Sequence, residues 1–158
     1  MQRIRIGPTR RTALVIMAVL LMPETCLGQT CMISGMTMSF GTYNPRSSTP
    51  TLTTGIVTFR CAVSVPVKIK FYNSTSGAGP DSARLTSRNH QIQYKLFLDP
   101  ARTAPLGNGL NGTQYYDNPA PPADTNVTVP IFGEIPPGQN GVAAGAYSDT
   151  ITVEIDDE

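Results

Sequence analysis

Residues 65–72 read Val-Pro-Val-Lys-Ile-Lys-Phe-Tyr, and they show the clearest two-residue period in the chain. Every odd position is apolar, while the even positions include Lys68 and Lys70. Because successive side chains of a strand point to opposite faces, this alternation predicts a β-strand with its odd-numbered side chains buried and its lysines in water. A half-buried strand of this kind is typical of all-β proteins.

Similar stretches lie on both sides of this strand. Residues 55–61 place Val57, Phe59 and Cys61 on one face, and residues 127–131 and 151–155 alternate in the same way. Turn residues separate the stretches, since the chain contains 14 glycines and 14 prolines. No segment of helical period follows the first 28 residues. Six or seven short strands in about 130 residues predict one domain with an immunoglobulin-like sandwich fold.

Two further stretches are each predicted to form a single strand. Most even positions from Met32 to Phe40 are apolar, so we expect this set of side chains to share one buried face. Residues 91–98 also alternate, with the even positions apolar. The glycine- and proline-rich residues 99–125 are predicted to be irregular.

The first 28 residues follow the plan of a secretory signal peptide. A cationic start precedes an apolar run at residues 12–22, which is too short to span a bilayer. Small side chains at Cys26 and Gly28 lie three and one positions before the expected cut. We therefore expect residues 1–28 to be removed, which leaves residues 29–158 as a mature domain without a transmembrane segment.

Two alternatives concern the route of export. A lipoprotein would need small and aliphatic residues directly before Cys26, whereas a proline and two polar residues stand there. The pair Arg10 and Arg11 is compatible with twin-arginine export, although adjacent arginines are common in ordinary signals. An ordinary signal peptide remains the prediction.

The three cysteines fit this interpretation. Removal of Cys26 with the signal leaves Cys31 and Cys61, and an even pair in an exported chain predicts one disulfide. The alternative is two unpaired buried thiols. A bond across a loop of about 30 residues would stabilise the fold by roughly 3–4 kcal/mol and would tie the first strand to the second.

Charge and polar residues argue against nucleic-acid binding and catalysis. The chain has 12 Lys+Arg against 11 Asp+Glu, and no basic stripe extends beyond Lys68 and Lys70. His90 is the only histidine, expected in a solvated loop, whereas zinc and copper sites normally need several His or Cys ligands. No Gly-x-Ser-x-Gly elbow occurs, and nothing in the sequence brings Glu134 and Asp149 to a shared cleft. We expect no enzyme activity, no metal and no cofactor.

Five stretches of the chain carry a resemblance through their order and spacing. The stretches are Cys31-Met-Ile-Ser-Gly to Met38-Ser-Phe-Gly-Thr-Tyr43, Thr54-Gly-Ile-Val-Thr-Phe-Arg-Cys61, Tyr94-Lys-Leu-Phe-Leu-Asp99, Ile131-Phe-Gly-Glu-Ile-Pro-Pro-Gly-Gln139 and Ala144-Gly-Ala-Tyr-Ser-Asp-Thr-Ile-Thr-Val153. Each stretch is a weak signal alone, but together they run through nearly all of the mature chain. In this order and spacing they resemble the spore coat protein U domain proteins, a family that includes subunits of archaic, Csu-type chaperone-usher pili.

The resemblance implies an incomplete immunoglobulin-like sandwich that lacks its last strand. A periplasmic chaperone would complete it first, and a donor strand from a neighbouring subunit would do so later, as a form of β-augmentation. The final predicted strand carries Ile151, Val153 and Ile155, which we expect to face the chaperone or the donor strand. Little chain follows that strand, so we expect an open groove with exposed apolar side chains and unpaired backbone groups beside it.

The expected cut bears on the position of the subunit in a fibre. Cleavage after Gly28 leaves Gln29 and Thr30 before Cys31, whereas the shaft subunits of the family carry a longer donor extension. We therefore expect a subunit that accepts a strand without donating one, at a tip or another terminal position. A cut near Ala18 would instead leave a hydrophobic segment able to act as a donor strand.

The sequence therefore predicts an exported structural subunit of a chaperone-usher type pilus or surface fibre. Its expected partners are a periplasmic pilus chaperone, an outer-membrane usher and neighbouring pilus subunits, and its expected route runs through the periplasm to the cell surface. The alternative is a self-standing secreted coat or ligand-binding domain, which would be a stable monomer without any chaperone.

Overall fold

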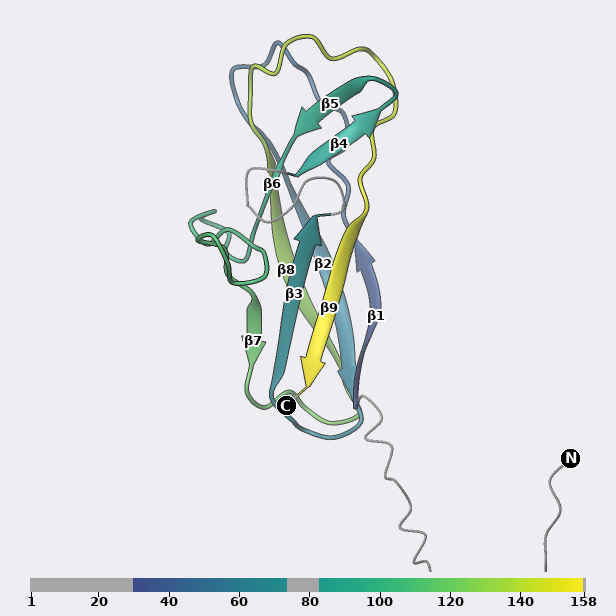
Figure 1. Cartoon of the computed structure of the whole chain (residues 1–158), viewed down its shortest axis with the longest axis vertical. Coiled ribbons are helices and arrows are strands. Elements are labelled where there is room, and N and C mark those ends of the chain that lie inside the picture. The colour runs from purple at the N-terminus through teal and green to yellow at the C-terminus, as the bar shows by residue number, and fades with distance from the viewer. Residues whose placement is uncertain (1–29, 74–82, 158) are drawn as a thin grey trace, which may run out of the picture.

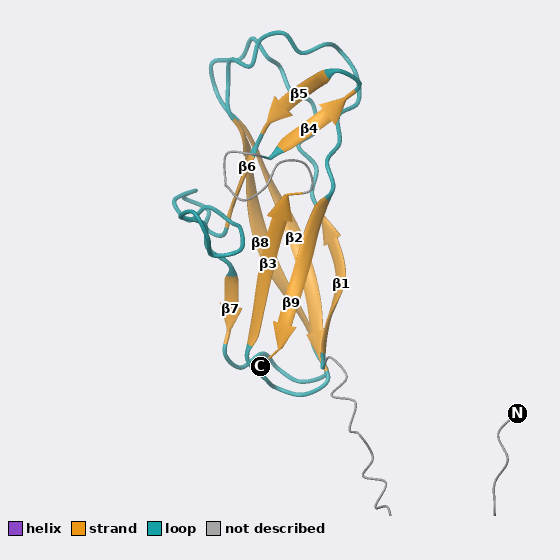
Figure 2. Cartoon of the chain, in the orientation of Figure 1, coloured by secondary structure: helices purple, strands orange, loops and turns teal. Residues whose placement is uncertain are grey.

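The computed structural model describes residues 30–73 and 83–157. The expected signal peptide, residues 1–28, lies outside the described residues. Within them every regular element is a β-strand, as Figure 2 shows in orange. No helix in this part of the chain is long and apolar enough to cross a membrane.

Two antiparallel sheets pack face to face, with a separate hairpin at one end. The larger sheet has the order β1-β2-β8-β6, the smaller sheet has the order β7-β3-β9, and β4 pairs with β5. Figure 1 shows β3 and β9 in front of β1, β2 and β8, with the hairpin at the top. The described strands are β1 (Cys31–Thr37), β2 (Thr51–Cys61), β3 (Val67–Asn73), β4 (Arg84–Ser87), β5 (His90–Gln93), β6 (Lys95–Phe97), β7 (Tyr116–Asn118), β8 (Asn126–Ile135) and β9 (Ile151–Asp157).

The core lies between the two sheets and confirms the period-2 predictions. In β3 the side chains of Val67, Ile69 and Phe71 are buried, while Lys68 and Lys70 are partly exposed on the other face. In β2 the predicted set of Val57, Phe59 and Cys61 is fully buried. Inward-facing residues from both sheets form one apolar cluster. The chain is therefore an all-β, immunoglobulin-like sandwich, as predicted.

The disulfide is also confirmed. Cys31 and Cys61 are bonded with an S–S distance of 2.05 Å, and they are directly opposite each other in the β1–β2 ladder. Both residues are buried. The bond therefore ties the edge strand β1 to its neighbour at the end of the sandwich where β1 begins.

The prediction of one shared face from Met32 to Phe40 is wrong at its first residue. The β1–β2 register shifts between Ile33 and Gly35, so one residue of β1 has no direct partner in β2. A bulge of this kind moves the following side chains to the opposite face. Met32 is consequently 65% exposed, whereas Met36 packs against the core.

The prediction of a single strand over residues 91–98 is also wrong. The chain passes from β5, in the hairpin, to β6, in the larger sheet, with Tyr94 between them. The even-numbered side chains from Ile92 to Leu96 are buried, as the alternation predicts. One continuous alternating stretch, residues 91–98, thus contributes a strand to the hairpin and another to the larger sheet. The segment 99–125 is irregular as predicted, except for the short β7.

Candidate functional site

The outermost strands of the two sheets lie next to each other along one side of the sandwich. β1 is the end strand of the larger sheet and β9 is the end strand of the smaller one. Figure 1 shows them side by side, with β1 running up and β9 running down. An outermost strand presents backbone groups that no ladder partner satisfies. β6 and β7 are the other two end strands, but the sandwich opens into a pocket beside β1 and the start of β9, and we call the side between β1 and β9 the groove.

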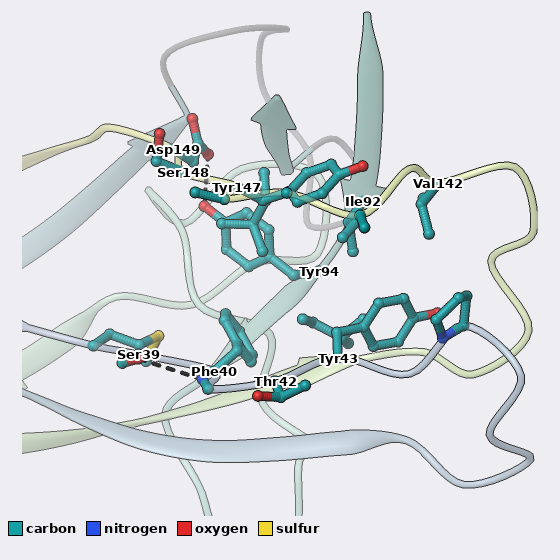
Figure 3. A pocket seen from close by; sticks show the side chains of 18 of the residues that line it. Ser39, Phe40, Thr42, Tyr43, Ile92, Tyr94, Val142, Tyr147, Ser148 and Asp149 are labelled. Atoms are coloured by element: carbon teal, nitrogen blue, oxygen red, sulfur yellow. Dashed lines mark hydrogen bonds between the residues drawn. The ribbon is translucent and has the colours of Figure 1, made fainter. Parts of the chain in front are cut away.

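A pocket of about 950 Å³ lies at the upper end of the groove. Its walls are the continuation of β1 as far as Pro45, the hairpin β4–β5, and the segment 142–151 that leads into β9. Most of the side chains that reach into it are apolar or aromatic (Figure 3). They include Met36, Met38, Phe40, Tyr43, Leu85, Ile92, Tyr94, Ile135, Val142, Tyr147 and Ile151.

Two glycines shape this end of the groove. A Cβ at Gly55 would lie only 2.6 Å from the Thr37 carbonyl oxygen. Glycine at this position of β2 therefore leaves room for the backbone at the end of β1. A Cβ at Gly133 would lie 2.8 Å from the Phe40 ring. The ring fills that space and meets Tyr94 edge-on, with ring centroids 5.7 Å apart. The continuation of β1 can therefore turn its side chains into the pocket.

Polar contacts fix the aromatic wall. The Tyr94 hydroxyl donates to Asp149 Oδ2 at 2.7 Å, in the segment that precedes β9. Burial is the main cause that raises the pKa of Tyr94, and the hydrogen bond to Asp149 adds to it. Tyr94 therefore stays a protonated donor at physiological pH. The hydrogen bond therefore joins the residue between β5 and β6 to the segment that leads into β9.

A second set of contacts holds the rim. The Tyr43 hydroxyl donates to the Pro136 carbonyl at 3.4 Å and accepts from the Gln139 amide at 3.2 Å. The Gln139 side chain accepts from Gln93 N at 2.7 Å and donates to Gln93 O at 2.8 Å, so it pairs with β5 as a strand would. Three segments far apart in the sequence are thereby joined around the pocket.

The predicted residues of the final strand lie along the groove. Ile155 is buried, while Ile151 and Val153 are partly buried and pack against the core. Of the three, only Ile151 lines the pocket. Their position agrees with the expectation that this strand borders an open side, and their contact with a chaperone or donor strand stays a prediction.

Sequence reasoning missed the pocket itself. Its wall comes from residues such as Phe40, Tyr94 and Tyr147, each of which lies in one of the five stretches quoted above but is distant from the others in sequence. The alternation predicts burial of Phe40 and Tyr94, but no feature of the sequence indicates that residues from these distant stretches meet in one pocket.

The residues considered for catalysis and metal binding are placed as follows. His90 belongs to β5 rather than to a loop, and its Nδ1 lies 3.0 Å from the Gly141 carbonyl oxygen. Asp149 is bound by Tyr94, and Glu134 lies in β8 opposite Leu52 and Lys95. Among the described residues, no group of three or more His, Cys, Asp or Glu side chains could hold a metal ion.

These features define the class of the protein: a disulfide-bonded, immunoglobulin-like sandwich whose two end strands border an apolar groove. The model of the Spore Coat Protein U domain matches residues 18–154, and the chain belongs to this family. The match begins inside the segment expected to be the signal peptide. No curated protein sequence matches the chain.

The solved structures that are similar to the chain include two of pilus subunits. The P pilus rod subunit PapA is 14% identical, with a TM-score of 0.51, and the similarity covers 82% of this chain and 100% of that one. The chaperone–tip adhesion subunit pre-assembly complex of the archaic chaperone-usher Csu pili of Acinetobacter baumannii gives 20% identity, a TM-score of 0.48 and coverage of 80% of this chain. This chain spans 39% of the length of the matching chain in that complex. The likeness to the rod subunit shows a shared fold.

Proposed function

We propose that this chain is an exported structural subunit of a chaperone-usher type pilus or surface fibre, which accepts an extended strand from another protein in the groove between β1 and β9. The observation that carries the proposal is the apolar pocket between the end strands of the two sheets. Membership of the Spore Coat Protein U domain family and the fold shared with a pilus rod subunit support it.

The edges of the groove favour a strand as the ligand. β1 and β9 each end a sheet, so an inserted strand can extend a ladder with backbone hydrogen bonds. Soluble proteins usually protect such edges with charges, prolines or covering loops. Here the side chains that face the pocket from the two edges are Met36, Met38 and Ile151, which carry no charge.

The pocket also indicates the chemistry of the inserted side chain. Phe40, Tyr43 and Tyr94 give it aromatic walls, and its one carboxylate, that of Asp149, already accepts a hydrogen bond from Tyr94. An apolar side chain enters such a site without leaving a polar group unsatisfied, whereas a charged one would lose its hydration. The partner strand should therefore place a bulky apolar or aromatic residue at the upper end of the groove.

The expected partners follow from this role. A periplasmic chaperone would fill the groove during transit, and a neighbouring subunit would replace it after delivery to an outer-membrane usher. The subunit would then reach the cell surface as part of a fibre, and it would perform no catalysis. The apolar groove is the reason for a chaperone, because an exposed apolar strand edge promotes aggregation.

We further propose that the subunit occupies a tip or another terminal position in the fibre. This position depends on cleavage after Gly28, because only Gln29 and Thr30 would then precede Cys31. Mass spectrometry of the exported chain measures the cut. A mature start at Gln29 supports a terminal subunit, whereas a start near Ala18 would leave a segment able to donate a strand and would contradict it.

The test of the main proposal is expression of the full chain in the periplasm, alone and with a candidate chaperone encoded beside it. We expect degradation or aggregation alone and a soluble one-to-one complex with the chaperone. A matched pair of variants locates the contact: Met38→Gln places an amide in the pocket just beyond the end of β1, whereas Met32→Gln places it on the exposed face of β1. Only Met38→Gln should weaken the complex.

One opposite outcome would favour the self-standing coat or ligand-binding domain. A chain that accumulates in the periplasm as a soluble monomer without the chaperone, with its disulfide formed, would contradict donor-strand completion. Equal complex formation by both methionine variants would contradict the assignment of the groove as the contact.

A further inference from the structure

A carboxylate connects the two border strands at the lower end of the groove. Asp157, the last residue of β9, accepts three hydrogen bonds through its Oδ2 atom. The donors are Thr30 N at 2.5 Å, Thr30 Oγ1 at 2.6 Å and Cys31 N at 3.1 Å. These three bonds, which we call the Asp157 clamp, join strands that belong to different sheets.

The clamp lies beside the disulfide. Cys31 donates to Asp157 and is bonded to Cys61 on β2, so the lower ends of β9, β1 and β2 are held together. At the upper end, Met36 of β1, Met38 just beyond β1 and Ile151 of β9 all line the pocket. The groove is thus held together at its lower end by the Asp157 clamp and leads at its upper end into the pocket.

The Asp157 clamp and an inserted strand cannot both occupy the same position along the groove. Neighbouring strands lie about 4.8 Å apart, so a strand paired with both β1 and β9 would hold them roughly 9.6 Å apart. An aspartate side chain that donors on the facing strand approach to 2.5–3.1 Å cannot span that separation. Where the clamp is intact, no strand passes between β1 and β9.

We propose that the Asp157 clamp sets the lower limit of the site that receives a partner strand. The inference rests on the proposed function. The partner strand pairs with the upper parts of β1 and β9, inserts its bulky apolar side chain into the pocket, and stops above the clamp. Asp157 is accordingly a positioning residue, which fixes the length and register of the bound strand without contacting the pocket.

The test uses the full exported chain, purified as its chaperone complex and then separated from the chaperone, and a synthetic peptide in which isoleucine alternates with threonine. Amide hydrogen exchange, measured residue by residue by NMR, is compared with and without the peptide in the wild type, Asp157→Ala and Asp157→Asn. Asp156→Ala is the matched control, because it removes the same charge one position earlier, from a side chain that pairs with Lys70 on the outer face.

We expect the peptide to slow exchange in the upper parts of β1 and β9 of the wild type and to leave the amides of Thr30 and Cys31 unchanged. In free Asp157→Ala those two amides should exchange at least tenfold faster, and the bound peptide should then protect residues further down, toward Ile33. Asp157→Asn, whose side-chain oxygen still accepts hydrogen bonds, should lie between. Asp156→Ala should behave as the wild type.

Two results would overturn the inference separately from the proposed function. In one, the peptide binds the wild type and protects the groove down to Thr30 and Cys31. In the other, Asp157→Ala binds it over the same length as Asp156→Ala. Absence of binding by the wild type and by every variant would contradict the proposed function, and this inference with it, whatever the exchange of the Thr30 and Cys31 amides in the free protein.

Discussion

At Gly133, the absence of a side chain leaves the space that the Phe40 ring occupies in the wall of the pocket. An added Cβ would lie 2.8 Å from both the Phe40 ring and the Thr53 methyl group. Since the core around β8 is closely packed, Gly133→Ala should force one of these groups to move and lower the free energy of unfolding by about 1–3 kcal/mol. Urea unfolding of the oxidised protein, with or without bound chaperone, measures the change.

Gly35 provides the control for this substitution. It lies in the edge strand β1, and an added Cβ there would have no heavy atom within 4 Å. Gly35→Ala should therefore change the free energy of unfolding by no more than about 0.5 kcal/mol. Equal losses for the two variants would mean that glycine in a strand, rather than the space for Phe40, accounts for the effect.

The disulfide is an element-scale feature, because it connects β1 to β2 where the rest of β1 has only one neighbour. Its two cysteines are 30 positions apart, for which the chain-entropy model gives about 3–4 kcal/mol. Replacing both with alanine should lower the free energy of unfolding by that amount. It should also loosen the lower end of β1, which the Asp157 clamp and the backbone hydrogen bond from Ala62 N to the Thr30 carbonyl would still hold.

Hydrogen exchange separates these two effects. In the double alanine variant, the amides of β1 should exchange faster relative to those of β8, which is a central strand. Exchange that rises equally in both strands would show a global loss of stability without a specific release of β1.

The elements of the fold differ in how far the sequence predicts them. β2, β3, β8 and β9 follow from alternation, because each spans at least seven residues and turns its apolar side chains toward the core from one face. β4 does not, since Arg84-Leu-Thr-Ser has a single apolar residue, and all four of its side chains are only partly buried. Its partner for pairing is β5, with Ser148 on the other side, and neither contact leaves a periodic signal.

The same distinction applies to the site. The border strand β9 and its three apolar residues were predictable, because burial of one strand face is a local property of the sequence. The pocket and the clamp were not predictable. They depend on contacts between residues that are far apart in the sequence, Phe40 with Tyr94 and Thr30 with Asp157. Such contacts depend on how two sheets are stacked, which no local period records.

At the scale of the whole molecule, the sandwich combines a closed end with an open end. The disulfide and the Asp157 clamp hold the lower end. At the upper end, hydrogen bonds such as that from Tyr94 to Asp149 fix the pocket walls without filling the space between them. A subunit built in this way can keep a defined fold while one part of its core remains available to another chain.

The pH dependence of stability tests how much the carboxylates of Asp157 and Asp99 contribute to the stability of the whole fold. The pKa of Asp157 is lowered, chiefly by the hydrogen bond from the Thr30 side chain, and the pKa of Asp99 is lowered chiefly by the Ala104 amide. A pKa below the unfolded value of about 3.9 means that the unfolded chain binds more protons near that pH. The stability from both groups is therefore present above about pH 4 and lost as the pH falls through the folded pKa values.

We accordingly expect the free energy of unfolding to fall between about pH 4 and pH 2, and to fall less steeply in the double variant Asp99→Asn/Asp157→Asn. Asp117→Asn, at an exposed position of β7, removes one negative charge without touching either set of hydrogen bonds and serves as the control. Urea unfolding across this range gives the slopes. If the double variant kept the slope of the wild type, the acid sensitivity would come from carboxylates elsewhere, and the clamp would stabilise only its own corner of the groove.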